Sequence, residues 1–218
     1  MVEAVFFDLD GTLADTAPDL GGALNRVRNE EGLPHVPLHQ LRPVVSQGVR
    51  GLLRVGFGLN PDDPGYALLQ ERVLSHYERA ICDETVLFPG IEALLERLEM
   101  RGLPWGIITN KRARYTEPLV HALQLKTRAV AVISGDTAGI PKPAPDPMLY
   151  ACRAAGVAPE NCWYVGDDLR DVQAAHAANM RAIAAVWGYL GDGAPPEQWQ
   201  ADALAHNPDD IARLIGLS

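Results

Sequence analysis

Residues 8–12 read Asp8-Leu9-Asp10-Gly11-Thr12, and this stretch decides the fold that the sequence predicts. The run Val5-Phe6-Phe7 before it is typical of a strand buried on both faces, and such strands belong to parallel sheets covered by helices. Because these sheets bind ligands at the carboxyl ends of their strands, we expect Asp8 and Asp10 in a crevice. Two carboxylates repel each other there unless a cation lies between them. Oxygen ligands without histidine or cysteine favour Mg²⁺.

The composition limits the classes of partner. With 218 residues and 47% hydrophobic content, the chain has enough apolar side chains for a packed core and an inserted smaller domain. A net charge of -9 argues against nucleic-acid and membrane-surface binding, so we expect a small-molecule partner. The amino-terminal residues do not resemble a signal peptide, and the three cysteines form no Cys-x-x-Cys pair, which together predict a cytoplasmic protein. The composition gives no prediction of oligomeric state.

A helical segment follows the acidic stretch. Apolar residues recur at helical spacing after Thr16, and again from Tyr66 to Ile81, with turn signals between and no convincing strand. We therefore predict a helical domain over residues 16–83, inserted into a core domain made of residues 1–15 and 84–218.

Polar residues gather at two later points of the chain. Thr109, Asn110 and Lys111 follow the apolar run at 105–108, where they provide a hydroxyl donor and an amide, although Thr-Asn is also a common helix cap. Lys142 lies between two prolines just before a predicted helix, which suits a fixed cation but also an ordinary surface lysine.

A last acidic group follows the predicted strand Trp163-Tyr164-Val165. It contains Asp167, Asp168 and Asp171. Asp167 is expected to bind a metal ion directly, and Asp171 directly, through water, or by orienting another ligand. Asp168 has two readings, a share in the metal site or a stabilising charge at the start of the next helix.

Together these stretches resemble the motifs of the haloacid dehalogenase superfamily. Asp8-x-Asp10-Gly11-Thr12 is similar to its first motif, Thr109 to the second, Lys142-Pro143 to the third, and Gly166-Asp167-x-x-x-Asp171 to the fourth. The resemblance implies a Rossmann-like α/β core with a parallel sheet and an inserted helical cap. It also implies an Mg²⁺-dependent phosphatase.

The resemblance further implies a role for each matching residue. Asp8 would attack phosphorus and form an aspartyl-phosphate, Asp10 would be the general acid and base, and Thr109 and Lys142 would stabilise the phosphoryl group. Asp8, Asp167, Asp171 and the backbone carbonyl of Asp10 would hold the metal ion.

Within the superfamily the chain looks like phosphoglycolate phosphatases and especially N-acetylmuramic acid 6-phosphate phosphatases of cell-wall recycling. This implies a small carboxylated phosphate ester as substrate, either 2-phosphoglycolate or N-acetylmuramic acid 6-phosphate. Asn110 and Lys111 are expected to contact it, Gly48 to allow close backbone approach, and Arg50 to pair with its carboxylate, although Arg50 also suits a solvated helix surface. A sugar phosphomutase and a non-catalytic interaction protein are the alternatives.

Overall fold

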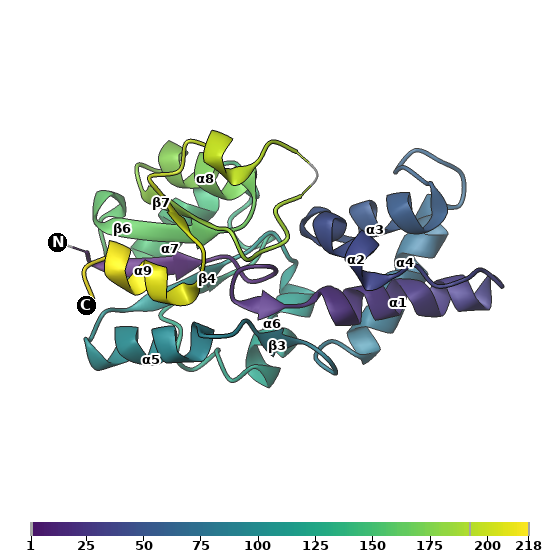
Figure 1. Cartoon of the computed structure of the whole chain (residues 1–218), viewed down its shortest axis with the longest axis horizontal. Coiled ribbons are helices and arrows are strands. Elements are labelled where there is room, and N and C mark those ends of the chain that lie inside the picture. The colour runs from purple at the N-terminus through teal and green to yellow at the C-terminus, as the bar shows by residue number, and fades with distance from the viewer. Residues whose placement is uncertain (1, 192, 218) are drawn as a thin grey trace.

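The core of the protein is a parallel sheet of six strands. A computed structural model describes residues 2–191 and 193–217. The strand order is β5-β4-β1-β6-β7-β8, and every neighbouring pair is parallel, which confirms the predicted α/β class (Figure 1). The strands are β1 (Ala4–Phe7), β4 (Trp105–Ile108), β5 (Val132–Ile133), β6 (Cys162–Gly166), β7 (Arg181–Ala185) and β8 (Ala203–Ala205).

Alternation along β1 explains how both faces of the sheet are covered. Val5 and Phe7 pack in one apolar cluster, whereas Ala4 and Phe6 pack in another, and all four residues are fully buried. The first cluster includes residues of α5 (Ile91–Met100), α6 (Ala113–Ala122) and α9 (Pro208–Leu214), and the second includes residues of α7 (Asp146–Ala155) and α8 (Leu169–Ala177). Helices on both faces hold β1 at the centre, so the residues after it are fixed in position.

The chain between residues 15 and 86 forms a separate group of helices. These are α1 (Ala17–Glu30), α2 (Leu38–Leu41), α3 (Gly48–Phe57) and α4 (Tyr66–Arg79), with the 3₁₀ segment η1 (Arg42–Gln47). They have their own apolar cluster and lie to one side of the sheet, away from both chain ends (Figure 1). The antiparallel pair β2 (Ala14–Asp15) and β3 (Val86–Leu87) forms the connection. The outer limits of the predicted core domain, residues 1 and 218, lie outside the described residues.

The apolar pattern also predicts a helix over residues 38–45, a helix from about Thr116 to Leu123 and a strand over residues 129–133, and the boundaries of these elements differ in the structure. The helix expected over residues 38–45 divides into α2 and η1, with Pro43 in the first turn of η1, where its missing N–H costs no hydrogen bond. The helix expected from Thr116 begins at Ala113, because the side chain of Asp136 accepts the Ala113 N–H from a distant part of the chain. The strand expected over residues 129–133 keeps only two paired residues at the edge of the sheet.

Within residues 2–191 and 193–217, no helix has both the length and the apolar composition needed to cross a membrane.

Candidate active site

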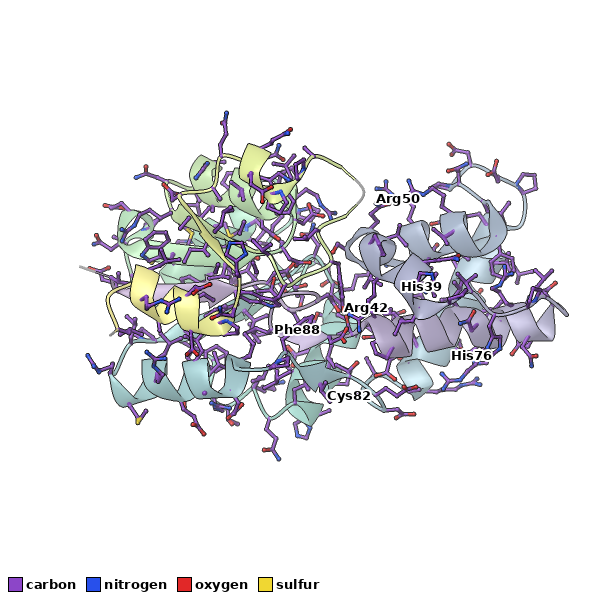
Figure 2. All side chains as sticks on the ribbon, viewed as in Figure 1. His39, Arg42, Arg50, His76, Cys82 and Phe88 are labelled. Atoms are coloured by element: carbon purple, nitrogen blue, oxygen red, sulfur yellow. The ribbon has the colours of Figure 1, made fainter. Side chains whose placement is uncertain are left out.

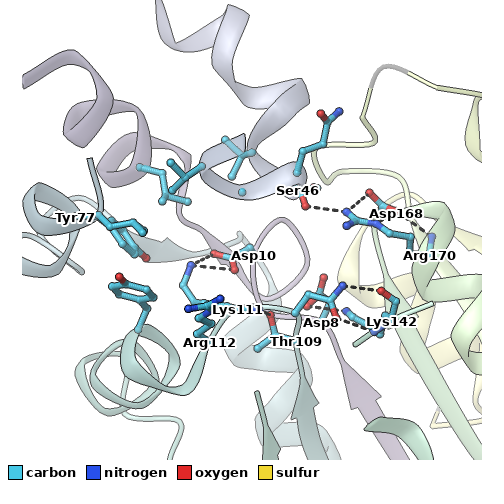
Figure 3. Close-up of a pocket in the computed structure, with 18 of the residues that line it drawn as sticks. Asp8, Asp10, Ser46, Tyr77, Thr109, Lys111, Arg112, Lys142, Asp168 and Arg170 are labelled. Atoms are coloured by element: carbon cyan, nitrogen blue, oxygen red, sulfur yellow. Dashed lines mark hydrogen bonds and ion pairs between the residues drawn. The ribbon is translucent and has the colours of Figure 1, made fainter. Parts of the chain in front are cut away.

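Most residues predicted at different strand ends meet in one cavity of about 350 Å³, between the sheet and the helical group, whereas Asp167 is fully buried and does not line it (Figure 3). Asp8 follows β1 and Thr109 follows β4, so the parallel sheet brings their side chains to the same edge. The cavity is also lined by further predicted residues, namely Asp10, Gly48, Asn110, Lys111, Lys142, Asp168 and Asp171.

Lys142 is the fixed cation of the site. Its side chain is only 2% exposed, and its Nζ lies 3.1 Å from Asp8 Oδ1 and 2.7 Å from Asp171 Oδ1. It also donates to the hydroxyl of Tyr164 (2.8 Å) and the carbonyl of Ile108 (3.2 Å). Burial alone would lower the pKa of Lys142, but the carboxylates of Asp171 and Asp8 outweigh burial and raise it. The ammonium group therefore stays charged beside Asp8.

Asp8, Asp167 and Asp171 form a compact carboxylate cluster. One oxygen of each lies within 4.8 Å of the others. The pKa of Asp8 is raised to about 7, first by burial and then by the Asp171 and Asp10 charges, and Lys142 only partly opposes these effects. Burial, Asp8 and Asp171 likewise raise the pKa of Asp167. Three crowded oxygen donors with disfavoured negative charges have the chemistry of a site for a hard divalent cation such as Mg²⁺.

Two glycines allow this crowding. A Cβ atom on Gly11 would lie 2.2 Å from Asp167 Oδ2, and one on Gly188 would lie 2.2 Å from Asp167 Cβ. Gly11 also has a φ of +86°, which other residues rarely adopt. The side chain of Asp167 is then held by hydrogen bonds from the Thr12 hydroxyl (2.9 Å) and the Tyr189 N–H (2.8 Å).

The carboxylate of Asp10 faces a different set of partners. It accepts a hydrogen bond of 2.6 Å from the Thr16 hydroxyl, and Lys111 Nζ donates to its two oxygens at 2.8 and 3.0 Å. Burial alone would lower the pKa of Lys111, but Asp10 and Tyr77 raise it, and the Nζ lies 4.9 Å from the centre of the Tyr77 ring. Lys111, predicted to contact substrate, is thus a partner of Asp10 in this structure.

Asn110 lines the cavity but uses its amide group on Lys142. Its Nδ2 donates to the Lys142 carbonyl and its Oδ1 accepts the Lys142 N–H, both at 2.9 Å. These reciprocal bonds fix the backbone that carries the Lys142 ammonium group. Thr109 is buried beside them, and its hydroxyl accepts the Lys111 N–H at 3.2 Å.

Asp168 and Asp171 have different positions. Asp168 is the N-cap of α8, where its side chain accepts the N–H of Arg170, and Asp171 accepts the N–H of Asp168 in a reciprocal capping box. Asp171 also reaches the carboxylate cluster, whereas Asp168 forms an ion pair with the side chain of Arg170. The contacts of Asp168 are therefore those of a residue at the start of a helix, which is the second of its two interpretations.

Arg50 lies outside the cavity. It is exposed on α3, and the adjacent Val49 lines the cavity instead (Figure 2). Neighbouring helix residues differ in direction by about 100°, and the Arg50 side chain is exposed to solvent. The expected contact between Arg50 and a substrate carboxylate is therefore not supported by this placement.

Several cavity residues were not expected from the sequence. They include Ser46, Tyr77, Arg112, Tyr115 and Arg170. Arg112 directly follows Lys111, and Arg170 directly precedes Asp171. Their positions next to these motif residues are the sequence feature that could have identified them as cavity residues. The sequence pattern identified Tyr77 only as part of an apolar helix face.

Comparisons with known proteins agree with this architecture. A family model described as haloacid dehalogenase-like hydrolase matches residues 5–185. A phosphoglycolate phosphatase of Xanthomonas campestris is 45% identical over 209 residues, covering 95% of this chain and 94% of the relative. An N-acetylmuramic acid 6-phosphate phosphatase of Pseudomonas putida is 35% identical over 214 residues, covering 98% and 96%.

The fold has close counterparts among solved structures. A haloacid dehalogenase-like family protein from Streptococcus pneumoniae has a TM-score of 0.84 and 25% identity, with 98% of each chain covered. A second structure, from Haemophilus somnus, also has a TM-score of 0.84, at 24% identity and with 98% and 97% coverage. The family match, the relatives and the geometry of the site agree, and the chain belongs to the haloacid dehalogenase-like hydrolases.

Proposed function

We propose that this phosphatase hydrolyses a small carboxylated phosphate monoester through an aspartyl-phosphate on Asp8. The observation that carries the proposal is the position of Asp8, which contacts the buried Lys142 ammonium group and belongs to the carboxylate cluster. A carboxylate beside a fixed cation can approach an anionic phosphoryl group that it would otherwise repel. Measuring phosphate released from a panel of phosphate esters tests the proposal, and an isomerised sugar phosphate without free phosphate would favour the mutase alternative.

The first step forms a bond between an Asp8 oxygen and phosphorus while the bond between phosphorus and the leaving oxygen breaks. Lys142 and the Thr109 hydroxyl stabilise the phosphoryl oxygens, and Asp10 gives its proton to the departing alkoxide. In the second step Asp10 takes a proton from water as the water oxygen attacks phosphorus. The bond between Asp8 and phosphorus then breaks, which releases inorganic phosphate and restores the Asp8 carboxylate.

The chain's own residues are suited to hold Mg²⁺ in this reaction. Asp8, Asp167 and Asp171 would hold it with their carboxylates, and Asp10 with its backbone carbonyl. Bound Mg²⁺ neutralises charge on the phosphoryl oxygens and on the carboxylates themselves.

We further propose a division of labour between two domains. The core, residues 1–15 and 84–218, carries the groups that act on phosphorus. The helical domain, residues 16–83, acts as a cap and provides the wall that meets the rest of the substrate. Gly48 belongs to that wall, since it lines the cavity with a φ of +64°, and a backbone turn without a side chain leaves room for a ligand.

The lining of the cavity favours the larger of the two candidate substrates. Its volume of about 350 Å³ corresponds to roughly a dozen water molecules, which is generous for a two-carbon acid phosphate. Part of its wall is apolar or aromatic, formed by Leu20, Val45, Val49, Leu74, Tyr77 and Tyr115. These features suit the ring, methyl and acetyl groups of N-acetylmuramic acid 6-phosphate better than 2-phosphoglycolate.

Arg112 is the best candidate to receive the carboxylate of the substrate. Lys111, Lys142 and Arg170 also line the cavity, but each is paired with an aspartate. No ion pair joins Arg112 to any carboxylate in residues 2–191 and 193–217, and it lies at the N-cap of α6. An incoming carboxylate would find an unneutralised guanidinium group there, able to form a bidentate pair.

Replacing Arg112 should therefore change selectivity. Arg112→Ala is expected to lower kcat/KM for N-acetylmuramic acid 6-phosphate by about 10- to 100-fold, because a charge-assisted contact is lost. The same variant should hydrolyse p-nitrophenyl phosphate, which has no carboxylate, at nearly the wild-type rate. Arg50→Ala is the matched control, since Arg50 is an exposed arginine outside the cavity. A larger loss in Arg50→Ala than in Arg112→Ala would reject this assignment.

A further inference from the structure

Arg170 joins the core to the helical domain at the edge of the cavity, and the steps proposed above do not use it. It is the second residue of α8. Its Nε and Nη2 donate to the two carboxylate oxygens of Asp168, at 2.8 Å each, while its backbone N–H donates to Asp168 Oδ1 at 2.9 Å. This bidentate pair fixes the plane of the guanidinium group.

The same guanidinium group also reaches the helical domain. Nη2 donates to the backbone carbonyl of Ser46 at 2.8 Å, across the cavity edge drawn in Figure 3. Ser46 is in η1, and it lines the cavity together with Gln47 and Gly48. The Ser46 hydroxyl lies 3.5 Å from Asp167 Oδ2. One arginine thus ties segment 46–48 to the loop that carries the metal-binding carboxylates.

Stability of α8 does not account for an arginine at this position. A cation in the first helical turn opposes the helix dipole, and the capping box of Asp168 and Asp171 already satisfies this helix start. The side chain is only 33% exposed, so it is largely removed from water. Besides its pair with Asp168, the Arg170 guanidinium group contacts the Ser46 carbonyl of the helical domain.

A second contact between the domains provides a comparison. On α6, Arg114 donates from Nε to Oε1 of Glu78 in α4, at 2.8 Å. These side chains are 65% and 40% exposed, and neither residue lines the cavity. Exposed ion pairs of this kind contribute little to stability. The Arg170 side chain is less exposed, and the hydrogen bond from its charged guanidinium group to the Ser46 carbonyl contributes more to stability.

We propose that Arg170 is a positioning residue that holds segment 46–48 over Asp8, and so aligns the leaving group of the substrate. This inference rests on the proposed phosphatase function. A small ester has few groups that can reach segment 46–48, whereas a sugar phosphate fills the cavity. Loss of Arg170 should therefore affect the larger substrate more, because remote contacts orient the reacting phosphate.

The kinetic test compares two substrates in three variants. Arg170→Ala is expected to lower kcat/KM for N-acetylmuramic acid 6-phosphate by about 10- to 100-fold, and for p-nitrophenyl phosphate by less than about threefold. Arg170→Lys should recover part of the loss, since an ammonium group can reach the carbonyl but cannot also form the bidentate pair with Asp168. Glu78→Gln, which weakens the exposed contact, should behave like wild type.

Amide hydrogen exchange tests the contact independently of catalysis. In Arg170→Ala, exchange in segment 44–50 should become faster, while amides of β1 and β6 should exchange as in wild type. Unchanged exchange in segment 44–50, or equal kinetic losses on both substrates, would overturn the proposal. If wild-type protein releases phosphate from no ester, the proposed function fails, and the exchange measurement still decides whether Arg170 holds the segment.

Discussion

An Asp8→Asn variant is expected to fold normally and to lose turnover by on the order of 10⁴-fold or more. The amide has nearly the same shape as the carboxylate, and its oxygen can still accept the hydrogen bonds that Leu9 N–H and Lys142 now donate to Asp8 Oδ1. It cannot act as the phosphoryl acceptor. Phosphate release at saturating substrate measures the loss.

Thermal unfolding of the same preparation separates chemistry from folding. Folding raises the pKa of Asp8 to about 7. The free energy of unfolding therefore decreases as the pH rises from the unfolded pKa of this group to its folded pKa, because the buried carboxyl group becomes charged. Removing that charge should therefore not lower the Tm of the metal-free protein at pH 7. Asp209→Asn, at an exposed aspartate of α9, is the matched control and should keep full activity. Substantial turnover by Asp8→Asn would remove Asp8 from its proposed role.

Removing divalent metal is expected to have the second-largest effect, a loss of about 10³-fold or more that added Mg²⁺ reverses. The reason is the crowding of Asp8, Asp167 and Asp171, whose oxygens lie within 4.8 Å of one another, while Lys142 contacts two of the three carboxylates. Chelated protein would be assayed before and after adding back Mg²⁺. Full activity in chelated protein that elemental analysis finds free of divalent metal would contradict the expectation.

A binding measurement supports the same test without catalysis. A ligand that binds only the folded state raises Tm. Mg²⁺ would also stabilise the charged forms of Asp8 and Asp167, which burial and mutual repulsion disfavour. The Tm of chelated protein should therefore rise with added Mg²⁺. The rise should be smaller in Asp167→Asn, which keeps the size of the side chain and removes one charged ligand.

The sequence predicted those parts of the site that depend on short stretches. A buried strand followed by Asp8, and later strands followed by Thr109 and Asp167, were enough to place these groups at one edge of a parallel sheet. The apolar spacing of the helical segment predicted α1 and α4 in the same way. In each case the signal lies within about a dozen neighbouring residues.

The parts of the fold and of the site that the sequence did not predict depend on contacts between residues far apart in the chain. The pairing of Lys111 with Asp10 joins residues 101 positions apart, and nothing local to either residue indicates it. The bond from Arg170 to Ser46 spans 124 positions. Arg50 was expected in the cavity because Gly48 precedes it, but the direction of a helical side chain depends on how α3 packs. Short elements such as β2 and β8 form through pairing with other strands rather than through their own sequence.

The most direct test of the central claim is to trap the phosphoryl group on the enzyme. Wild-type protein would be mixed with excess substrate and Mg²⁺, quenched in acid within milliseconds, digested and analysed by mass spectrometry. We expect one added phosphoryl group on the peptide that contains Asp8, localised to that residue and absent from Asp8→Asn. Rapid phosphate release without any phosphorylated Asp8 peptide, or with the phosphoryl group on another residue, would contradict it.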